Sequence, residues 1–235
     1  MDTPTATSSR HWPAGWHVDV VVETGSTNAD MLAAAAQGAA DRSVLVALHQ
    51  TAGRGRLDRR WDAPPGVNLL ASLLFRDFAG SPHVLTQRVG LAALAACRRL
   101  AGVNAELKWP NDVLLEGAKL AGILAQAQFG ERPAVVVGIG INVGWAPEGA
   151  ALLGTGIDPL DLVAGLLSAY DELPTDVWPL YRRHLATLGK RVRVELADRV
   201  VEGRAVDVER DGRLVVVDDD AVPHRFDAGD VVHLR

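Results

Sequence analysis

The sequence predicts an α+β fold, in which helices pack on a mixed, largely antiparallel sheet and a small SH3-like β-barrel follows at the C-terminus. Several apolar runs have the length and the β-branched content of buried strands. Other stretches, rich in alanine and leucine, carry the start and stop signals of helices. From Arg191 onward, short alternating runs are separated by glycine turns, which is typical of a small all-β unit.

The predicted strands of the large sheet fall into three groups. An alternating β-branched run comes first, and two apolar runs then flank a loop rich in glycine and arginine. The remaining strands suit an antiparallel meander, which contains a Pro-Asn-Asp turn. The strand segments are residues 18–23, 44–48, 68–75, 106–115, 119–128 and 134–142.

Four helices are predicted from their spacing and their end signals. Residues 29–37 follow a cluster of hydroxyl and amide residues and end before a glycine. Residues 81–102 begin with Ser-Pro and end with glycine, the clearest pair of helix signals in the chain. Residues 158–173 and 178–188 have helical spacing, and a glycine follows the second segment.

The C-terminal strands are short, and the turns between them contain Glu-Gly, Asp-Gly and Ala-Gly pairs. We place a domain boundary near Leu188, which gives a larger domain of residues 1–188 and a small β-barrel domain of residues 189–235. The expected strands of the small domain are residues 191–196, 205–208, 214–217 and 231–234.

The composition excludes several classes of protein. The 235 residues are 48% hydrophobic, enough to bury one substantial core. We expect a cytoplasmic protein without a membrane partner, because no run approaches membrane-span length, residues 1–10 lack a secretory signal, and Cys97 is a single cysteine. The net charge of −5 argues against non-specific binding of nucleic acid. The seven histidines show no metal-ligand spacing, so no protein metal site is predicted.

The loop of residues 49–61 is the stretch around which the chain is organised. Four arginines and one aspartate lie between Gly53 and Trp61, and the glycines among them let a ligand approach the backbone closely. The pattern fits an anion-binding loop and a solvated basic hairpin tip equally well. It is no P-loop, because the chain has no Lys-Ser or Lys-Thr pair, and no dinucleotide loop, because Asp58 replaces the third glycine.

Three other segments have a structural and a functional interpretation. Ser26, Thr27 and Asn28 could cap a helix, which their spacing favours, or bind a small polar ligand. Lys119 opens an apolar strand, where edge protection is favoured over a phosphate contact. Residues 138–142, Gly-Ile-Gly-Ile-Asn, fit a buried strand whose glycines let a ligand or backbone lie close.

Taken together, five motifs closely resemble those of the biotin protein ligases. Each motif is weak alone, but they occur in the family's order from about residue 18 to residue 189, and a small β-barrel follows. The motifs are Gly-Ser-Thr-Asn at 25–28, Gln-Thr-Ala-Gly-Arg-Gly-Arg at 50–56, Lys-Trp-Pro-Asn-Asp at 108–112, Lys-Leu-Ala-Gly-Ile-Leu at 119–124 and Gly-Ile-Gly-Ile-Asn at 138–142.

The resemblance implies site residues and overrides two of the bland interpretations given above. The implied biotin-binding residues are Ser26, Thr27, Asn28, Gln50, Arg54, Gly55, Arg56, Lys119 and Gly122. The implied nucleotide-binding residues are Arg54, Arg56, Trp109, Asn111, Asp112, Lys119 and Asn142. The implied catalytic residues are Lys119, Arg54 and Arg56, and Lys119 is expected to contact the reacting carboxylate and the α-phosphate.

The resemblance also implies the reaction, in which ATP and biotin are substrates and Mg²⁺ is required. Biotin and ATP form biotinyl-5′-adenylate and pyrophosphate, and a lysine of a biotin carboxyl carrier domain then takes the biotin. Residues 1–188 would be the catalytic biotin- and ATP-binding domain. Positioned cations suit both steps, because negative charge develops on phosphate oxygens.

The chain departs from the family's pattern in three places. Asp58 stands where the arginine loop often has glycine, and Gln126 stands where a glutamate is common. Only about 17 residues precede the first predicted strand, without the winged-helix region of repressor-type members, so we expect no DNA binding. A monomer or a weak homodimer is expected.

Three rival functions remain. A lipoate or octanoate ligase or transferase of the related fold is disfavoured by the glycine-arginine loop and by Gln50, whose amide suits the ureido ring of biotin. A non-catalytic protein that binds biotin or a nucleotide is disfavoured by Lys119 and the loop arginines, which such a protein would not need. A nucleic-acid module would need interleaved aromatic residues, which the loop lacks.

Overall fold

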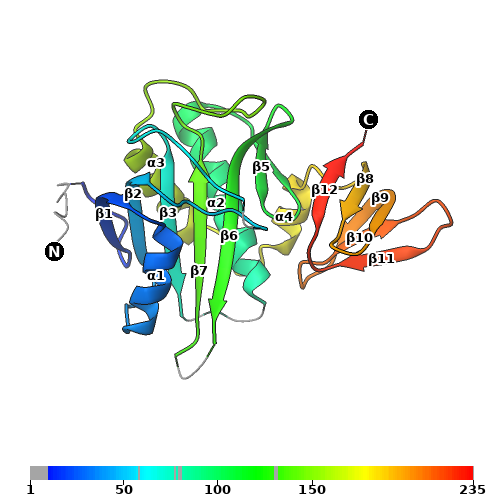
Figure 1. Ribbon diagram of the computed structural model, residues 1–235, viewed down its shortest axis with the longest axis horizontal. Coiled ribbons are helices and arrows are strands. Elements are labelled where there is room, and N and C mark those ends of the chain that lie inside the picture. Colours follow the sequence, from blue (N-terminus) through cyan, green and yellow to red (C-terminus); the bar gives the residue numbers. More distant parts are fainter. Residues whose placement is uncertain (1–9, 58, 77, 79–80, 130–131, 235) are drawn as a thin grey trace.

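The structure is a computed structural model that describes residues 10–57, 59–76, 78, 81–129 and 132–234. Figure 1 shows a large sheet surrounded by helices and, at the C-terminal end, a separate smaller sheet. Asp58, one of the departures from the family's pattern, lies outside the described residues. Within the described ranges, no helix has the length and apolar character needed to cross a membrane.

The large sheet has seven strands in the order β1-β2-β3-β7-β6-β5-β4. Strands β1 and β2 pair in parallel, and the other neighbours pair antiparallel, which confirms the predicted mixed, largely antiparallel sheet. The strands are β1 (His17–Thr24), β2 (Ser43–Gln50), β3 (Leu69–Phe75), β4 (Glu106–Lys108), β5 (Asp112–Leu115), β6 (Ala118–Gln128) and β7 (Ala134–Ile141).

The helices are α1 (Thr27–Ala36), α2 (Pro82–Ala101), α3 (Pro159–Asp171) and α4 (Trp178–His184). The end signals of α2 act as predicted: the Ser81 side chain accepts a hydrogen bond from the backbone N–H of His83, and Gly102 ends the helix in the left-handed conformation at φ 69°. The carboxylate of Asp158 caps α3 by accepting from the backbone N–H of Leu160.

Helix α4 is shorter than predicted and ends at His184 rather than at residue 188. The next residue, Leu185, forms an isolated parallel bridge with Leu107 of β4, and the backbone N–H of Ala186 donates to the carbonyl of Leu107. The chain therefore leaves the helix because sheet pairing satisfies its backbone, a tertiary interaction that helical spacing does not reveal.

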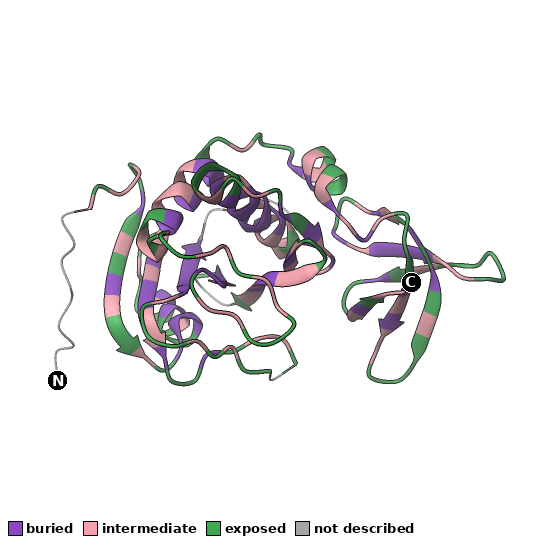
Figure 2. Ribbon diagram, turned by 90° about the horizontal axis from the view of Figure 1, so that it is seen from above, coloured by how far each residue is buried: buried purple, intermediate pink, exposed green. Residues whose placement is uncertain are grey.

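Helices cover both faces of the large sheet. Leu74 of β3 pairs with Val136 of β7, and both pack with Met31 of α1. Their neighbours Leu73 and Val137 point to the opposite face and join the main core, to which α2 and α3 contribute. Figure 2 shows the buried residues of the long helix α2 turned toward the sheet.

The C-terminal residues form a five-stranded antiparallel sheet in the order β11-β10-β9-β8-β12. Its strands are β8 (Arg191–Glu195), β9 (Val200–Val208), β10 (Leu214–Val217), β11 (Pro223–Phe226) and β12 (Asp230–His233). The predicted small all-β unit is confirmed, although β9 begins at Val200 rather than at residue 205. Strand β11 was missed because a proline and two polar residues precede Phe226. Leu188 lies in the turn that leads to β8, and the boundary there stays a prediction.

Candidate active site

A cavity of about 450 Å³ lies on the α1 face of the large sheet, within the usual size range of small-ligand sites. Its floor is built from glycines: Gly138 and Gly140 share the face of Val136, and Gly140 pairs with Gly122 of β6. Because these positions have no side chain, the side chains of Asn28 and Trp61 can approach the backbone of the sheet closely. Residues 138–141 thus form the end of strand β7, and the glycines let other groups lie close to its backbone, as predicted.

One end of the cavity carries an uncharged hydrogen-bond network. The Oε1 atom of Gln50 accepts from the backbone N–H of Thr27 at 2.7 Å and from its hydroxyl at 3.0 Å. Ser26 occupies the N-cap position of α1, but its side chain makes no capping hydrogen bond. The capping interpretation is therefore wrong here; Gln50 instead satisfies the backbone N–H of Thr27, the first residue of α1, which is one of the unpaired donors at a helix N-terminus.

Asn28 lies beneath this network and is fully engaged with protein atoms. Its Nδ2 atom donates to the carbonyl of Leu124 at 3.1 Å and to Oε1 of Gln126 at 2.9 Å. Its Oδ1 atom accepts from Ser72, whose hydroxyl also lies 2.8 Å from Oγ1 of Thr27. Asn28 therefore orients the network, and the predicted direct contact between Asn28 and a ligand stays a prediction.

We expect Gly138→Ala to destabilise the protein by about 1–3 kcal/mol, a typical cost of overpacking. A Cβ atom at Gly138 would lie 2.1 Å from Oδ1 of Asn28, which the hydrogen bonds described above hold in place. Urea unfolding measures the effect. Gly25→Ala is the matched control, because a Cβ atom there would meet nothing within 4 Å. Equal stability of the two variants would contradict the close packing of Asn28 against the strand.

The departure at Gln126 yields a second prediction. Gln126→Glu keeps an oxygen acceptor for Asn28, whereas Gln126→Leu leaves a part-buried N–H of Asn28 without that partner. We expect Gln126→Leu to cost about 1–3 kcal/mol in unfolding free energy and Gln126→Glu to remain near the wild type. Urea unfolding at pH 7 compares the two variants. A Glu variant as unstable as the Leu variant would show that the amide group itself is required.

The arginine loop folds as a narrow hairpin. The backbone N–H of Trp61 donates to the carbonyl of Gly53 at 3.0 Å, and Arg54 forms an isolated antiparallel bridge with Arg60. A Cβ atom at Gly53 would lie 2.3 Å from the carbonyl oxygen of Trp61, so this approach requires glycine. The arginines line the cavity, together with Gly55, and this location favours the anion-binding interpretation.

Trp61 is a site residue that the sequence analysis did not assign. A Cβ atom at Gly140 would lie 2.5 Å from the indole Nε1, and one at Gly122 would lie 3.1 Å from the ring, so the indole rests on the glycine floor. The indole Nε1 is buried and has no hydrogen-bond partner within the described part of the chain. The Nζ atom of Lys119 lies 5.7 Å from the ring centroid. Trp61 therefore covers the glycine floor with its ring and forms part of the cavity lining.

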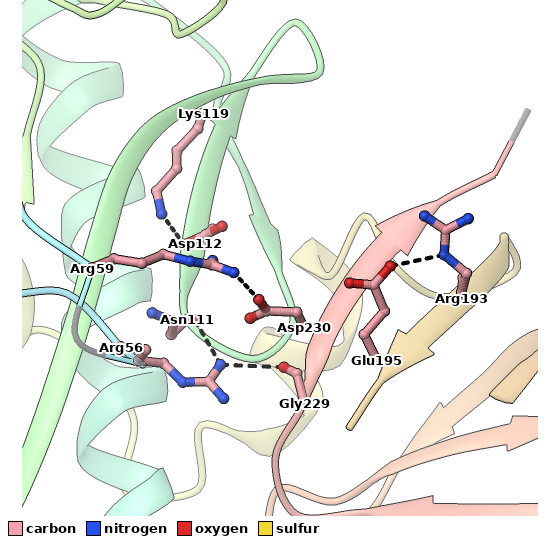
Figure 3. Close-up of polar contacts among 9 residues, drawn as sticks. All are labelled: Arg56, Arg59, Asn111, Asp112, Lys119, Arg193, Glu195, Gly229 and Asp230. Carbon is pink, nitrogen blue, oxygen red and sulfur yellow. Dashed lines mark hydrogen bonds and ion pairs between the residues drawn. The ribbon is translucent and has the colours of Figure 1, made fainter. Parts of the chain in front are cut away.

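The other end of the cavity is cationic and unites four of the predicted site residues (Figure 3). The Nζ atom of Lys119 forms an ion pair with Oδ1 of Asp112 at 2.7 Å. The guanidinium of Arg56 donates to Oδ1 of Asn111 at 3.1 Å, and Nδ2 of Asn111 donates to the carbonyl of Ile123 at 2.8 Å. The arginine loop, the turn before β5 and strand β6 thus meet at one point.

The cations at this end are partly desolvated and crowded. Burial lowers the pKa of Arg56, and the carboxylates of Asp230 and Asp112 act in the opposite direction. Burial also lowers the pKa of Lys108, an effect that Asp112 opposes and Lys119 reinforces. An anion bound among these groups would offset their repulsion and replace lost hydration, so the electrostatics favour a phosphate or carboxylate ligand.

The C-terminal sheet supplies one wall of the cavity. Asp230, the first residue of β12, forms an ion pair with Arg59, and the carbonyl of Gly229 accepts from Arg56 at 3.4 Å (Figure 3). Glu195 of β8 also lines the cavity. These residues belong to no motif and lie far along the chain from the arginine loop, so the sequence offered no signal for them.

Trp109 and Asn142 line the cavity, but protein atoms engage their side-chain donors. Trp109 is 2% exposed, precedes a cis peptide bond to Pro110 and donates from its indole to the carbonyl of Gly212 at 2.8 Å. The amide of Asn142 donates to the carbonyl of Ala151 at 3.0 Å. Both residues therefore shape the wall, and their predicted contacts with a nucleotide stay predictions.

No cluster of three or more His, Cys, Asp or Glu side chains suited to a metal ion occurs among the described residues. The cationic end contains the carboxylates of Asp112, close to Lys119, and of Asp230, paired with Arg59. One or two carboxylates suit Mg²⁺ that arrives with a nucleotide, because the phosphates and water then provide the remaining ligands.

Comparisons with known proteins agree with the motifs. Residues 16–143 match the Biotin/lipoate A/B protein ligase family, and residues 187–234 match the biotin protein ligase C terminal domain. A biotin–[acetyl-CoA-carboxylase] ligase from Mycobacterium tuberculosis is 41% identical over 94% of this chain and 91% of its own length. This chain belongs to the biotin protein ligase family. The bifunctional ligase/repressor BirA of Bacillus subtilis is 26% identical to this ligase over 89% of the chain and 71% of the relative.

Solved structures share the fold of this ligase. The biotin protein ligase from Aquifex aeolicus in complex with biotin and ATP has a TM-score of 0.77 and 24% identity, over 93% of this chain and 99% of that one. The biotin acetyl coenzyme A carboxylase synthetase from Helicobacter pylori with bound biotinylated ATP has a TM-score of 0.68 and 19% identity, over 90% and 100%. The predicted fold class is confirmed.

Proposed function

We propose that this ligase joins biotin to a lysine of a carrier domain in two steps. An oxygen of the biotin carboxylate attacks the α-phosphorus of ATP, the bond to the β-phosphate breaks, and biotinyl-5′-adenylate and pyrophosphate form. The lysine amine then attacks the acyl carbon, loses a proton and displaces AMP. The observation that carries the proposal is a single cavity with an uncharged polar end and a cationic end, in a member of this family.

The polar end is the proposed biotin site. The ureido ring of biotin has two N–H donors and a carbonyl acceptor, which match the hydroxyl and amide groups of Ser26, Thr27 and Gln50. Gly122 and Gly140 let the Trp61 indole lie against the sheet, where it forms one surface of the proposed site. Asn28 holds these groups in position through the network beneath them. A lipoyl or octanoyl chain would leave such buried polar groups unpaired, at a cost in affinity.

The cationic end is the proposed site of adenylation. Lys119 lies beside Asp112, so its ammonium is held where a carboxylate and an α-phosphate would meet. Arg54, Gly55 and Arg56 approach from the loop, and Asn111 orients Arg56. Trp109 and Asn142 form parts of the wall for the nucleotide. These cations stabilise the negative charge that develops during phosphoryl transfer, and Mg²⁺ bound with ATP would add to that charge stabilisation.

The arginine loop also has a protective role in this proposal. An acyl adenylate is a mixed anhydride that water hydrolyses, so the site must exclude water while the acceptor is absent. Trp61 and Arg56 close the cavity from the loop, and the C-terminal sheet meets the same loop through Asp230. Closure retains the intermediate until an acceptor lysine arrives.

The proposed acceptor is the biotin carboxyl carrier domain of a biotin-dependent carboxylase. The Mycobacterium tuberculosis relative is named as a ligase for acetyl-CoA carboxylase, which supports this choice. The expected cytoplasmic location, the absence of DNA binding and the monomeric or weakly dimeric state remain predictions of the same proposal.

Transfer to a purified carrier domain tests the acceptor. The protein, ATP, Mg²⁺ and biotin are incubated with the carrier domain of an acetyl-CoA carboxylase, and streptavidin detects the product. We expect labelling of the intact domain and none of a carrier variant in which arginine replaces the acceptor lysine. Failure to label the intact domain, while adenylate still forms, would reject this acceptor class. Attachment of lipoate or octanoate instead of biotin would favour the rival ligase.

A further inference from the structure

The turn that carries Asn111 and Asp112 is held in place from outside the cavity. The backbone N–H of Trp109 donates to Oγ1 of Thr187 at 3.0 Å, and Thr187 is completely buried. Oγ1 of Thr187 also lies 3.2 Å from Nε2 of His233, which is in β12. Neither Thr187 nor His233 lines the cavity, so these two residues have no place in the proposed ligand contacts.

The hydrogen bonds define a direction from the turn to the C-terminal sheet. Oγ1 of Thr187 accepts a hydrogen bond from the Trp109 N–H, so its own hydroxyl can donate to His233. Burial, reinforced by Lys108 and Lys190, lowers the pKa of His233 to about 4. The imidazole is therefore neutral at pH 7, and Nε2 accepts when the ring proton resides on Nδ1.

The same turn is fixed to the C-terminal sheet at a second point. The indole of Trp109 donates to the carbonyl of Gly212 at 2.8 Å, and the Trp109 side chain is buried. Both donors of Trp109, the indole N–H and the backbone N–H, are thus used outside the cavity. Beyond the cis bond to Pro110, the chain reaches Asn111, which binds Arg56, and then Asp112, which binds Lys119.

We propose that Thr187 and His233 are positioning residues that set the geometry of the nucleotide-side turn from the C-terminal sheet. The proposal rests on the proposed adenylation function. Thr187 acts through Trp109 on Asn111 and Asp112, and those residues orient the cations Arg56 and Lys119. A small displacement of such groups reduces catalysis and nucleotide binding, because the charge stabilisation depends on their geometry.

The test compares the Michaelis constants for ATP and biotin in ATP–pyrophosphate exchange with the full chain. Thr187→Val keeps the shape of the side chain but removes the hydroxyl that serves the buried N–H of Trp109. We expect Thr187→Val to raise the KM for ATP about tenfold and to change the KM for biotin less than twofold. Thr187→Ser, which keeps the hydroxyl, is expected to have a KM for ATP close to that of the wild type.

His233→Ala tests the second member of the pair without altering a fully buried site. We expect a smaller rise in the KM for ATP, and we expect the double variant with Thr187→Val to resemble Thr187→Val alone, because both changes break one chain of hydrogen bonds. His224→Ala is the matched control: His224 lies in β11 of the same sheet and contacts Asp218, and its variant should behave as wild type.

Three results would overturn the proposal. They are an unchanged KM for ATP in Thr187→Val, an equal rise for both substrates, and failure of Thr187→Ser to restore the value. If Thr187→Val does not fold, the KM for ATP is compared between His233→Ala and His224→Ala. A rise in His233→Ala alone supports the proposal, and equal values in the two variants overturn it. Exchange by the wild type tests the adenylation function separately. If the wild type shows no exchange, calorimetric titration measures the affinity of each variant for ATP instead. The proposal then predicts weaker ATP binding by Thr187→Val than by the wild type and by Thr187→Ser.

Discussion

Lys119→Ala is expected to lower the rate of adenylate formation by about 100- to 1,000-fold, the usual loss when a positioned group that stabilises transition-state charge is removed. The Nζ atom of Lys119 lies 2.7 Å from Asp112 at the cationic end of the cavity. Alanine removes the ammonium and leaves the Asp112 carboxylate unpaired beside the incoming phosphates. Biotin-dependent ATP–pyrophosphate exchange measures the rate directly.

Lys190→Ala is the matched control for this experiment. Lys190 is an exposed lysine outside the cavity, so its loss removes the same charge from the chain without changing the site. Its exchange rate should stay within twofold of the wild type. Near-normal exchange by Lys119→Ala would reject the α-phosphate contact and restore the interpretation of Lys119 as a strand-edge residue.

Arg56→Ala is expected to speed the release of biotinyl-5′-adenylate about 10- to 100-fold, in line with the loss of hydrogen bonds made by a charged group. Arg56 is half-buried and donates to Oδ1 of Asn111 at 3.1 Å and to the carbonyl of Gly229 at 3.4 Å. The residue therefore fixes the loop to both the large sheet and the C-terminal sheet. Without it, the loop opens more often and the intermediate escapes.

A single-turnover experiment with labelled biotin measures this release. The adenylate is formed on the enzyme, excess unlabelled biotin and ATP are added, and the bound label is followed by rapid gel filtration. Arg199→Ala serves as the control, because Arg199 is exposed in the turn between β8 and β9 and lies outside the cavity. An unchanged release rate for Arg56→Ala would mean that the loop does not retain the intermediate.

Local patterns predicted most of the large sheet and its helices. The Ser-Pro start and glycine end of α2 are local signals, and both act as expected. Helix α4 ended early because Leu185 pairs with β4, a contact between residues 78 positions apart. Strand β11 was missed because an edge strand with one exposed face needs no apolar run.

The site was predicted only in part, because local patterns mark some of its residues and contacts between distant segments place the others. The motifs located Gln50, Arg56 and Lys119 because each lies in a short pattern of glycines and polar residues. Spacing favoured a capping role for the helix entry, but no side chain there caps the helix, and Gln50 at the end of β2 binds the first backbone N–H of α1 instead. Trp61 was passed over, although an aromatic residue that ends a loop rich in glycine and arginine is a usable signal. Asp230 depends on the docking of the C-terminal sheet and has no local signal.

The measurement that tests the central claim most directly is ATP–pyrophosphate exchange by the purified protein with Mg²⁺, in parallel with biotin, lipoate and octanoate. The account predicts exchange with biotin and none with the two fatty acids, because the uncharged network at one end of the cavity suits a ureido ring and the cationic end suits ATP. Exchange with lipoate or octanoate would reassign the polar end. Biotin binding without any exchange would contradict adenylation at the cationic end and leave a protein that only sequesters biotin.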